Sequence, residues 1–130
     1  MLKTIQTVLA IALAGFISLS GAAEAGAVSK GTFTGLSNHI TTGGVEIIKN
    51  DDGSHTVVLA SDFTFDGAPD PRVGFGKNGK YDKATGMGLL KSLNGKQSYT
   101  VPAGVDPAAY NEVYIFCLKF NVPLGVASIK

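Results

Sequence analysis

The chain has 130 residues, of which 45% are hydrophobic, and its formal net charge is +1 at pH 7. This length is enough for one small domain with a single hydrophobic core. The scattered charges and their small sum exclude the basic face of a nucleic-acid-binding protein, and a single cysteine excludes an internal disulfide framework.

The beginning of the chain has the layout of a secretory signal peptide. A lysine near the start precedes an uncharged apolar run at residues 8–20, and small residues follow it. The apolar run is shorter than the roughly 20 residues that a membrane-spanning helix needs. Cleavage fits best after Ala23 or Ala25. We therefore expect residues 1–25 to be a signal peptide, residues 26–130 to form a mature domain without an integral membrane segment, and the protein to be periplasmic or extracellular.

Short β-prone segments separated by turns follow the signal-like segment. In chain order, the predicted strands cover residues 31–36, 45–49, 55–65, 72–76, 97–102, 113–120 and 125–129. They are rich in β-branched and aromatic residues, and Asp-Gly at 52–53 and Asn-Gly at 94–95 are typical turn dipeptides. Strands spaced by turns at about every ten residues predict a single all-β domain, an antiparallel β-sandwich or barrel.

Three further segments carry local signals. Two prolines and a glycine make residues 66–71 a loop. Asp106 before Pro107 predicts the start of a short helix, because Asp caps the first turn and Pro fits its first position. Residues 89–93 are compatible with either a strand or a helical turn.

The single cysteine lies in the last long apolar segment. Alternation along a strand places Cys117 on a face with Val113, Ile115 and Lys119, while Tyr114, Phe116, Leu118 and Phe120 share the other face. The wholly apolar second set predicts the main core. Cys117 is therefore predicted to lie outside it, near the edge of a second and thinner apolar layer.

Several roles remain open for Cys117. A free cysteine often packs as a small buried hydrophobe. In an exported protein a stray thiol is a liability, which favours a redox thiol, a ligand to a metal or heme, or an intermolecular disulfide. His39 is the candidate partner or second ligand because a neighbouring imidazole makes a thiol more reactive. The alternative for His39 is a turn residue bonded to backbone, and His55 is interpreted as a solvated hairpin residue.

Cofactor motifs narrow the choice without settling it. A c-type heme, a structural zinc site and an iron–sulfur cluster all need ligands that the chain lacks. A blue-copper site needs two His and a Cys, and here both histidines precede Cys117. A b-type heme, an incomplete copper site or a bare thiol remain, with copper less favoured than heme. Asp62, Asp66 and Asp70 could gather around calcium, but turn-forming aspartates are the better interpretation.

Taken together, several short motifs resemble one known family. The motifs are Gly31-x-Phe33, His39 ahead of Gly44-Val45, the segment 61–73 (SDFTFDGAPDPRV), Gly95-x-Gln97-x-Tyr99-x-Val101-Pro102 and the segment 114–127 around Cys117. Their order over residues 31–130 resembles the DM-thirteen domain, a small extracytoplasmic domain described as electron transfer and often found beside DOMON domains.

The resemblance implies an all-β domain whose signature cysteine is matched by Cys117. It also implies extracytoplasmic redox chemistry, through a naked thiol or a prosthetic group such as heme. One departure is Phe116, which stands where the family often has tryptophan and lacks the indole N–H donor.

We therefore expect an exported domain with an electron-transfer or redox role centred on Cys117, with His39 as its partner and the cofactor undetermined. No catalytic motif of a hydrolase or transferase is present, so an electron carrier or a binding module is favoured over a catalyst. With no DOMON or cytochrome segment attached, the electron partner would be another redox or envelope protein. The alternative is a non-catalytic binding or structural module of the cell envelope, with a packed cysteine and contact loops at residues 66–70 and 77–83.

Overall fold

Antiparallel strands dominate residues 26–130, the part of the chain that the computed structural model describes. The strands are β2 (Gly26–Gly35), β3 (Thr41–Thr42), β4 (Gly44–Lys49), β5 (His55–Leu59), β6 (Thr64–Phe65), β7 (Pro71–Lys77), β8 (Lys80–Tyr81), β9 (Gln97–Thr100), β10 (Glu112–Cys117) and β11 (Val122–Ser128). Two single-turn 3₁₀ helices, η3 (Lys83–Thr85) and η4 (Pro107–Ala109), complete the described elements. The predicted all-β antiparallel fold is confirmed.

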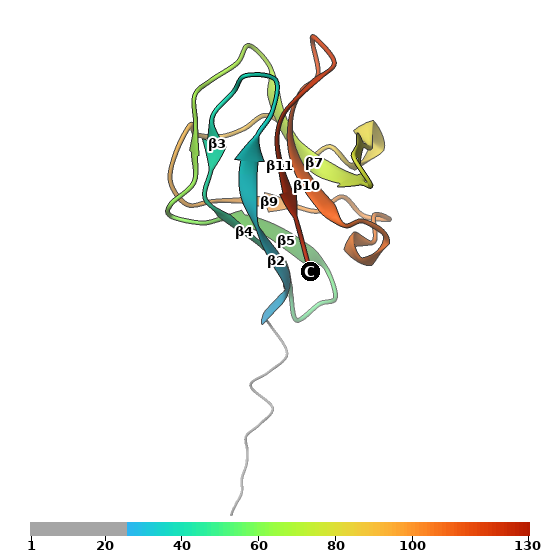
Figure 1. Ribbon diagram of the computed structural model, residues 1–130. Helices are drawn as coiled ribbons and strands as arrows, with labels where there is room; N and C mark the ends of the chain where they lie inside the picture. Colours follow the sequence, from blue (N-terminus) through green and yellow to red (C-terminus); the bar gives the residue numbers. More distant parts are fainter. Residues whose placement is uncertain (1–25) are drawn as a thin grey trace, which may run out of the picture.

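Eight of the strands form one curled sheet. Their order is β8-β7-β10-β11-β2-β4-β5-β9, and neighbouring strands pair antiparallel throughout. The sheet bends into an open half-barrel, and the short pair β3-β6 lies beside it (Figure 1). Alternation along the strands sends Val45, Ile47, Val57 and Leu59 into the concave side, where each is at most 1% exposed.

Turn chemistry accounts for several of the strand ends. The Asp-Gly turn at 52–53 joins β4 to β5, as its sequence predicts. The predicted strand 55–65 is interrupted after Leu59 because Phe63 N–H donates to Ala60 O and closes a turn. The predicted helix start is confirmed in short form: Asp106 caps η4 by accepting from Ala108 N–H at 3.0 Å. Residues 89–93 form neither a regular strand nor a helix, and Leu89 makes only an isolated bridge to Arg72.

The loops that follow β2, β6 and β10 gather at one end of the half-barrel, the upper end in Figure 1. Residue 26, where the described chain begins, lies at the other end. Within residues 26–130 no helix has the length and apolarity needed to cross a membrane. The predicted signal peptide, residues 1–25, lies outside the described residues.

Candidate functional site

Cys117 is the last residue of β10 and belongs to the main core. It pairs with Val122 of β11 on one side and with Pro71 of β7 on the other. Cys117 is 2% exposed, and Val113 and Ile115 on the same strand face are fully buried in the same cluster. The prediction that Cys117 lies in a thinner layer outside the core is therefore wrong.

The opposite face of β10 explains that error. Tyr114 and Phe116 point to the convex side of the sheet, where Tyr81 of β8 covers them. The rings of Tyr81 and Phe116 stack at 4.2 Å with an interplanar angle of 13°, and Tyr114 meets Tyr81 edge-on at 5.7 Å. Phe120, assigned by alternation to the same face, lies beyond the strand and is 59% exposed. The more aromatic face is thus a local outer cluster, which strand alternation alone does not distinguish from a core.

The strand ends at Cys117 because the next backbone amides bond elsewhere. Leu118 N–H donates to Asp70 O at 3.2 Å, and Lys119 N–H donates to the Asp70 carboxylate at 2.9 Å. The pairing of β10 with β11 is also irregular between Ile115 and Phe116. The irregularity leaves Leu124 without a partner on β10, and its carbonyl accepts from Leu36 N–H at 3.0 Å and from Thr41 Oγ1 at 2.9 Å. A bulge of this kind redirects a side chain, and Leu124 is one of the residues around Cys117.

A small apolar pocket of about 160 Å³ joins the cysteine to the first of the two histidines. It lies at the end of the half-barrel where the three loops gather. Its lining residues are His39, Ala68, Pro69, Cys117, Phe120, Val122 and Leu124. The two site residues predicted from the sequence, Cys117 and His39, thus border one cavity although the chain separates them widely.

His39 is held by a carboxylate. Its Nδ1 lies 2.8 Å from Asp66 Oδ1, and the other carboxylate oxygen accepts from Ile40 N–H at 3.1 Å. The hydrogen bond from the His39 imidazole, followed by the bond from the Ile40 amide, lowers the pKa of Asp66 below its ordinary value of 3.8. The ring of Phe65 lies 5.6 Å from that of His39. The imidazole therefore has a fixed polar partner and an apolar neighbour.

No hydrogen bond joins the Cys117 thiol to the imidazole in the described part of the chain, although both line the pocket. Proton transfer between them therefore needs a rotation of the thiol or a bridging molecule. Catalytic hydrogen bonds are often long before a ligand binds. The arrangement supplies a nucleophilic sulfur, a titratable ring and an ion that orients that ring.

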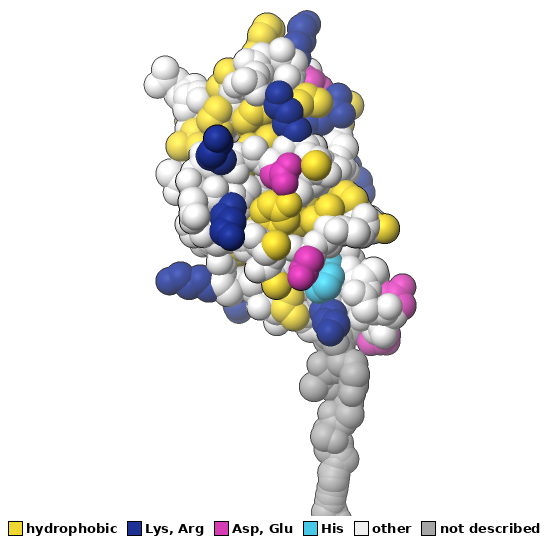
Figure 2. Space-filling model, turned by 90° about the vertical axis from the view of Figure 1, so that its right-hand side faces the viewer, with side chains coloured by type: hydrophobic (Ala, Val, Ile, Leu, Met, Phe, Trp, Pro, Cys, Tyr) yellow, Lys and Arg dark blue, Asp and Glu magenta, His cyan; other side chains and the backbone are white. Residues whose placement is uncertain are grey.

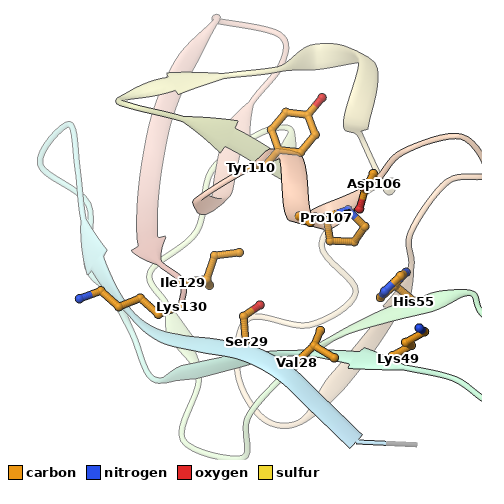
Figure 3. Close-up of a pocket in the computed structure, with 10 residues that line it drawn as sticks. Val28, Ser29, Lys49, His55, Asp106, Pro107, Tyr110, Ile129 and Lys130 are labelled. Atoms are coloured by element: carbon orange, nitrogen blue, oxygen red, sulfur yellow. Dashed lines mark hydrogen bonds between the residues drawn. The ribbon is translucent and has the colours of Figure 1, made fainter. Parts of the chain in front are cut away.

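His55 lies far from this pocket. It sits at the start of β5, opposite Lys49 of β4, and lines a separate pocket of about 390 Å³. Figure 3 shows it beside Lys49 and below Asp106, with Val28 on β2, the strand on the other side of β4. His55 follows the Asp-Gly turn and is half-buried, which agrees with its interpretation as a hairpin residue but makes it less solvated than expected.

The three spaced aspartates do not converge. Asp62 accepts from Gly44 N–H at 2.9 Å, Asp66 binds His39, and Asp70 accepts from Arg72 at 2.9 Å. Each supports a different loop, and their backbone partners, Gly44, Ile40 and Lys119, lie in distant segments. The interpretation as turn-forming aspartates that bond their own backbone is therefore not met. Among residues 26–130 no group of three or more His, Cys, Asp or Glu side chains is placed to hold a metal ion. A copper site built from both histidines and Cys117 does not fit this arrangement.

Heme does not fit the Cys117 pocket either. Pockets for drug-sized ligands measure about 300–1,000 Å³, and heme is at least that large. The cavity between Cys117 and His39 measures about 160 Å³ and is closed on one side by core residues such as Leu124. Within the described chain, the larger pockets contain no cysteine. The pocket that contains Cys117 is therefore too small for a heme.

Sequence reasoning missed the pairing of Asp66 with His39. It noted Asp66 only as one of three spaced aspartates. The two residues meet because the two-residue strands β3 and β6 pair, Thr41 with Phe65 and Thr42 with Thr64. Strands this short have no hydrophobic period, so no sequence signal could have identified the contact.

The rim of the pocket is apolar. Figure 2 shows another side of the domain, where hydrophobic side chains are exposed among scattered Lys, Arg, Asp and Glu side chains. Ile40, next to His39, is 64% exposed, and Phe120 at the pocket rim is 59% exposed. Access to Cys117 is thus framed by apolar rather than strongly charged groups.

Comparison with known proteins gives one result. A family model described as electron transfer DM13 matches residues 32–129 of the chain. No curated protein and no solved structure matches it significantly. The matched range contains Cys117, His39 and Asp66.

Proposed function

This chain belongs to the electron transfer DM13 family, which supports a general redox or electron-transfer role, and from that premise we propose that Cys117 is its redox centre. The single observation that carries this proposal is the pocket that Cys117 shares with His39. In this proposal Cys117 acts as a bare thiol, since the cavity is too small for heme. The reacting species of a thiol is its thiolate, so the centre needs a proton acceptor, and His39 supplies one.

The lone sulfur limits what the centre can do. The chain contains a single cysteine, so an internal dithiol–disulfide couple is not available to it. Cys117 can give one electron to an oxidised partner and its proton to His39, or its thiolate can attack a disulfide of another molecule, which forms a mixed disulfide and releases that disulfide's second sulfur as a thiolate. Because the thiol is 2% exposed, the electron partner approaches the pocket rim and does not reach deep into the core. The proposed partner is another redox or envelope protein.

The burial of Cys117 also supports a second candidate function. A cysteine that is 2% exposed within the main core behaves as a small packed hydrophobe. In that case the domain is a non-catalytic binding or structural module of the cell envelope. Its contact loops would include residues 66–70 at the upper end in Figure 1. The two candidates differ in whether the folded protein lets a reagent reach the sulfur.

Alkylation of the folded protein by iodoacetamide separates these candidates. We expect Cys117 to be labelled at a rate that stays constant with urea below the unfolding transition, because the small neutral reagent enters through the pocket. A packed cysteine would react only from unfolded molecules. For a domain stable by about 5 kcal/mol, that would slow labelling more than about a thousandfold against the unfolded chain. Cys117→Ala is the control for labelling at other groups.

Redox activity is tested on the same pair of proteins. Reduced wild-type protein is expected to reduce ferricyanide, followed by its visible absorbance, and Cys117→Ala is expected to leave it oxidised. A visible spectrum of protein exported from cells supplied with heme tests the prosthetic group directly. A Soret band that disappears in Cys117→Ala would contradict the bare-thiol proposal.

We further propose that the protein is exported. The support is the charged, apolar and small-residue layout of residues 1–25. Mass spectrometry of protein recovered outside the cytoplasm should give a mature chain that begins just after Ala23 or Ala25. A full-length chain found only in the cytoplasm would contradict the proposal.

A further inference from the structure

We infer that Asp66 is a positioning residue for the Cys117 centre: it holds His39 so that the free ring nitrogen accepts the thiol proton across the shared pocket. This inference rests on the proposed function. It assigns a role to a residue that the sequence analysis treated only as one of three turn-forming aspartates. Three observations on the described residues carry it, namely the fixed backbone around Asp66, the ring nitrogen it occupies and the lining of the pocket.

The backbone fixes Asp66 opposite the His39 segment. Asp66 N–H donates to Ile40 O at 3.1 Å, and the Asp66 carboxylate accepts from Ile40 N–H at 3.1 Å. The first of these bonds extends the backbone pairing of β3 and β6 by one residue, and the second ties the Asp66 side chain to the same residue. Buried Thr41 then ties the same segment to β11 through its bond to Leu124 O. The carboxylate is therefore held in place by more than its contact with the ring.

The contact with Asp66 selects one form of the imidazole. A carboxylate is only an acceptor, so the Nδ1 atom that lies 2.8 Å from Asp66 Oδ1 carries the hydrogen. In the neutral ring Nε2 is then the unprotonated nitrogen. Within residues 26–130 Nε2 makes no hydrogen bond, while His39 itself lines the pocket. A base with a free acceptor thus borders the cavity that contains the sulfur.

The proton step needs no other reactant. The S–H bond of Cys117 breaks, the proton moves to Nε2 of His39, and the electron pair stays on sulfur. The products are a thiolate and an imidazolium, and Asp66 stays ionised and stabilises the cation, as an orienting carboxylate does in catalytic triads. The step proceeds directly after rotation of the thiol or through one bridging molecule.

The other charged groups around the pocket are already engaged. Asp70 lies between Arg72, which donates to it at 2.9 Å, and the Lys119 amide. The Lys119 side chain lies over the Phe120 ring, 5.5 Å from its centroid. Asp66 is the carboxylate in direct contact with the imidazole. The Asp66 charge is therefore the electrostatic contact that should govern the ring.

The test compares pH profiles of Cys117 alkylation by iodoacetamide in the folded protein between pH 5 and 9. Asp66→Asn keeps the shape but removes the charge, and His39→Gln removes the base. Asp62→Asn and His55→Gln are matched controls, because Asp62 accepts from the Gly44 amide at the start of β4 and not from His39, and His55 lines the distant pocket. Circular dichroism and a urea curve establish that each variant is folded.

We expect Asp66→Asn and His39→Gln to move the midpoint of the pH profile upward and to slow alkylation at pH 7 by about threefold to tenfold. A midpoint that rises by one pH unit lowers the fraction of thiolate at pH 7 about tenfold. The controls should stay within about 1.5-fold of wild type, as charges without a direct contact are screened. A profile moved by His39→Gln but not by Asp66→Asn overturns the role of Asp66 and leaves the Cys117 centre intact. A thiol that never reacts in the folded state overturns the proposed function itself.

Nitrogen-15 chemical shifts of the wild-type imidazole provide a readout that needs no variant. We expect the neutral His39 ring to carry its proton on Nδ1. A ring that carries it on Nε2 would contradict the inference even if both variants failed to fold.

Discussion

Gly125→Ala tests the junction that holds the His39 segment against β11. A Cβ atom on Gly125 would lie 2.6 Å from Thr41 Oγ1 and 2.7 Å from both Thr41 Cβ and Cγ2. Thr41 is 2% exposed and bonded to Leu124 O, so it has no free space to move into. Overpacking of a well-packed core costs about 1–3 kcal/mol. We expect a loss of that size in the free energy of unfolding.

Gly44→Ala is the matched control. Gly44 is also in a strand, and its added Cβ would first meet Ala60 Cβ at 3.5 Å, an ordinary van der Waals contact. Replacing glycine by alanine where the backbone tolerates it stabilises by about 0.4–1 kcal/mol through the unfolded chain. Urea unfolding of both variants, with equal m-values, gives the comparison. A Gly125→Ala variant as stable as Gly44→Ala would refute the packing of Thr41 against β11 and the placement of His39 that depends on it.

Three further predictions concern stability and titration. Thr85→Val should lower the free energy of unfolding, measured in urea, by about 1–3 kcal/mol. The fully buried Thr85 Oγ1 accepts from Phe75 N–H at 2.8 Å, and valine would leave that amide unpaired. An unchanged unfolding midpoint would mean that water reaches the amide. The pKa of Asp66 is lowered in the folded state, so its bond to His39 stabilises the fold above pH 3.8, the ordinary value, and this contribution is lost as the pH falls further. The free energy of unfolding of Asp66→Asn should therefore decline less than that of wild type between pH 5 and pH 2. Parallel curves for the two proteins would contradict this role of the bond. Burial of Tyr114, followed by the charge of the Glu112 carboxylate, raises the pKa of Tyr114 to about 12. The neutral phenol therefore stabilises the fold below pH 10, and this stabilisation is lost as the pH rises toward 12. An ultraviolet titration of Tyr114→Phe should lack the last tyrosine step of the wild-type curve, and persistence of that step would assign it to another tyrosine.

The sequence predicted the features that depend on local chemistry. The Asp-Gly turn before His55, the cap of Asp106 on its 3₁₀ turn and the alternation inside β4 and β5 all depend on neighbouring residues, and all are found. Which side of β10 faces the core could not be predicted from neighbouring residues in the sequence. It depends on Tyr81, which lies on another strand and covers Phe116 from outside. A strand with two apolar faces cannot reveal which of them is the concave one.

The candidate site shows the same division. Cys117 and His39 could be selected by residue type and by resemblance to a family, and the structure places both on one pocket. Asp66 could not be selected, because its contact depends on the pairing of two very short strands. The size of the pocket was equally out of reach, since its lining residues come from three segments that lie far apart in the chain.

The place of β11 in the sheet has a consequence for how the domain folds. β11 is the last strand of the described chain, yet it lies between β10 and β2, and Gly125 pairs with Gly35 near the start. A chain that emerges from its N-terminus therefore cannot close the sheet until β11 has been made. Pairings between such distant segments fold slowly, on the scale of milliseconds to seconds. Until then β2 and β10 each present an open edge, which other chains could join. Truncation within β11 should therefore cause aggregation rather than the loss of a single strand.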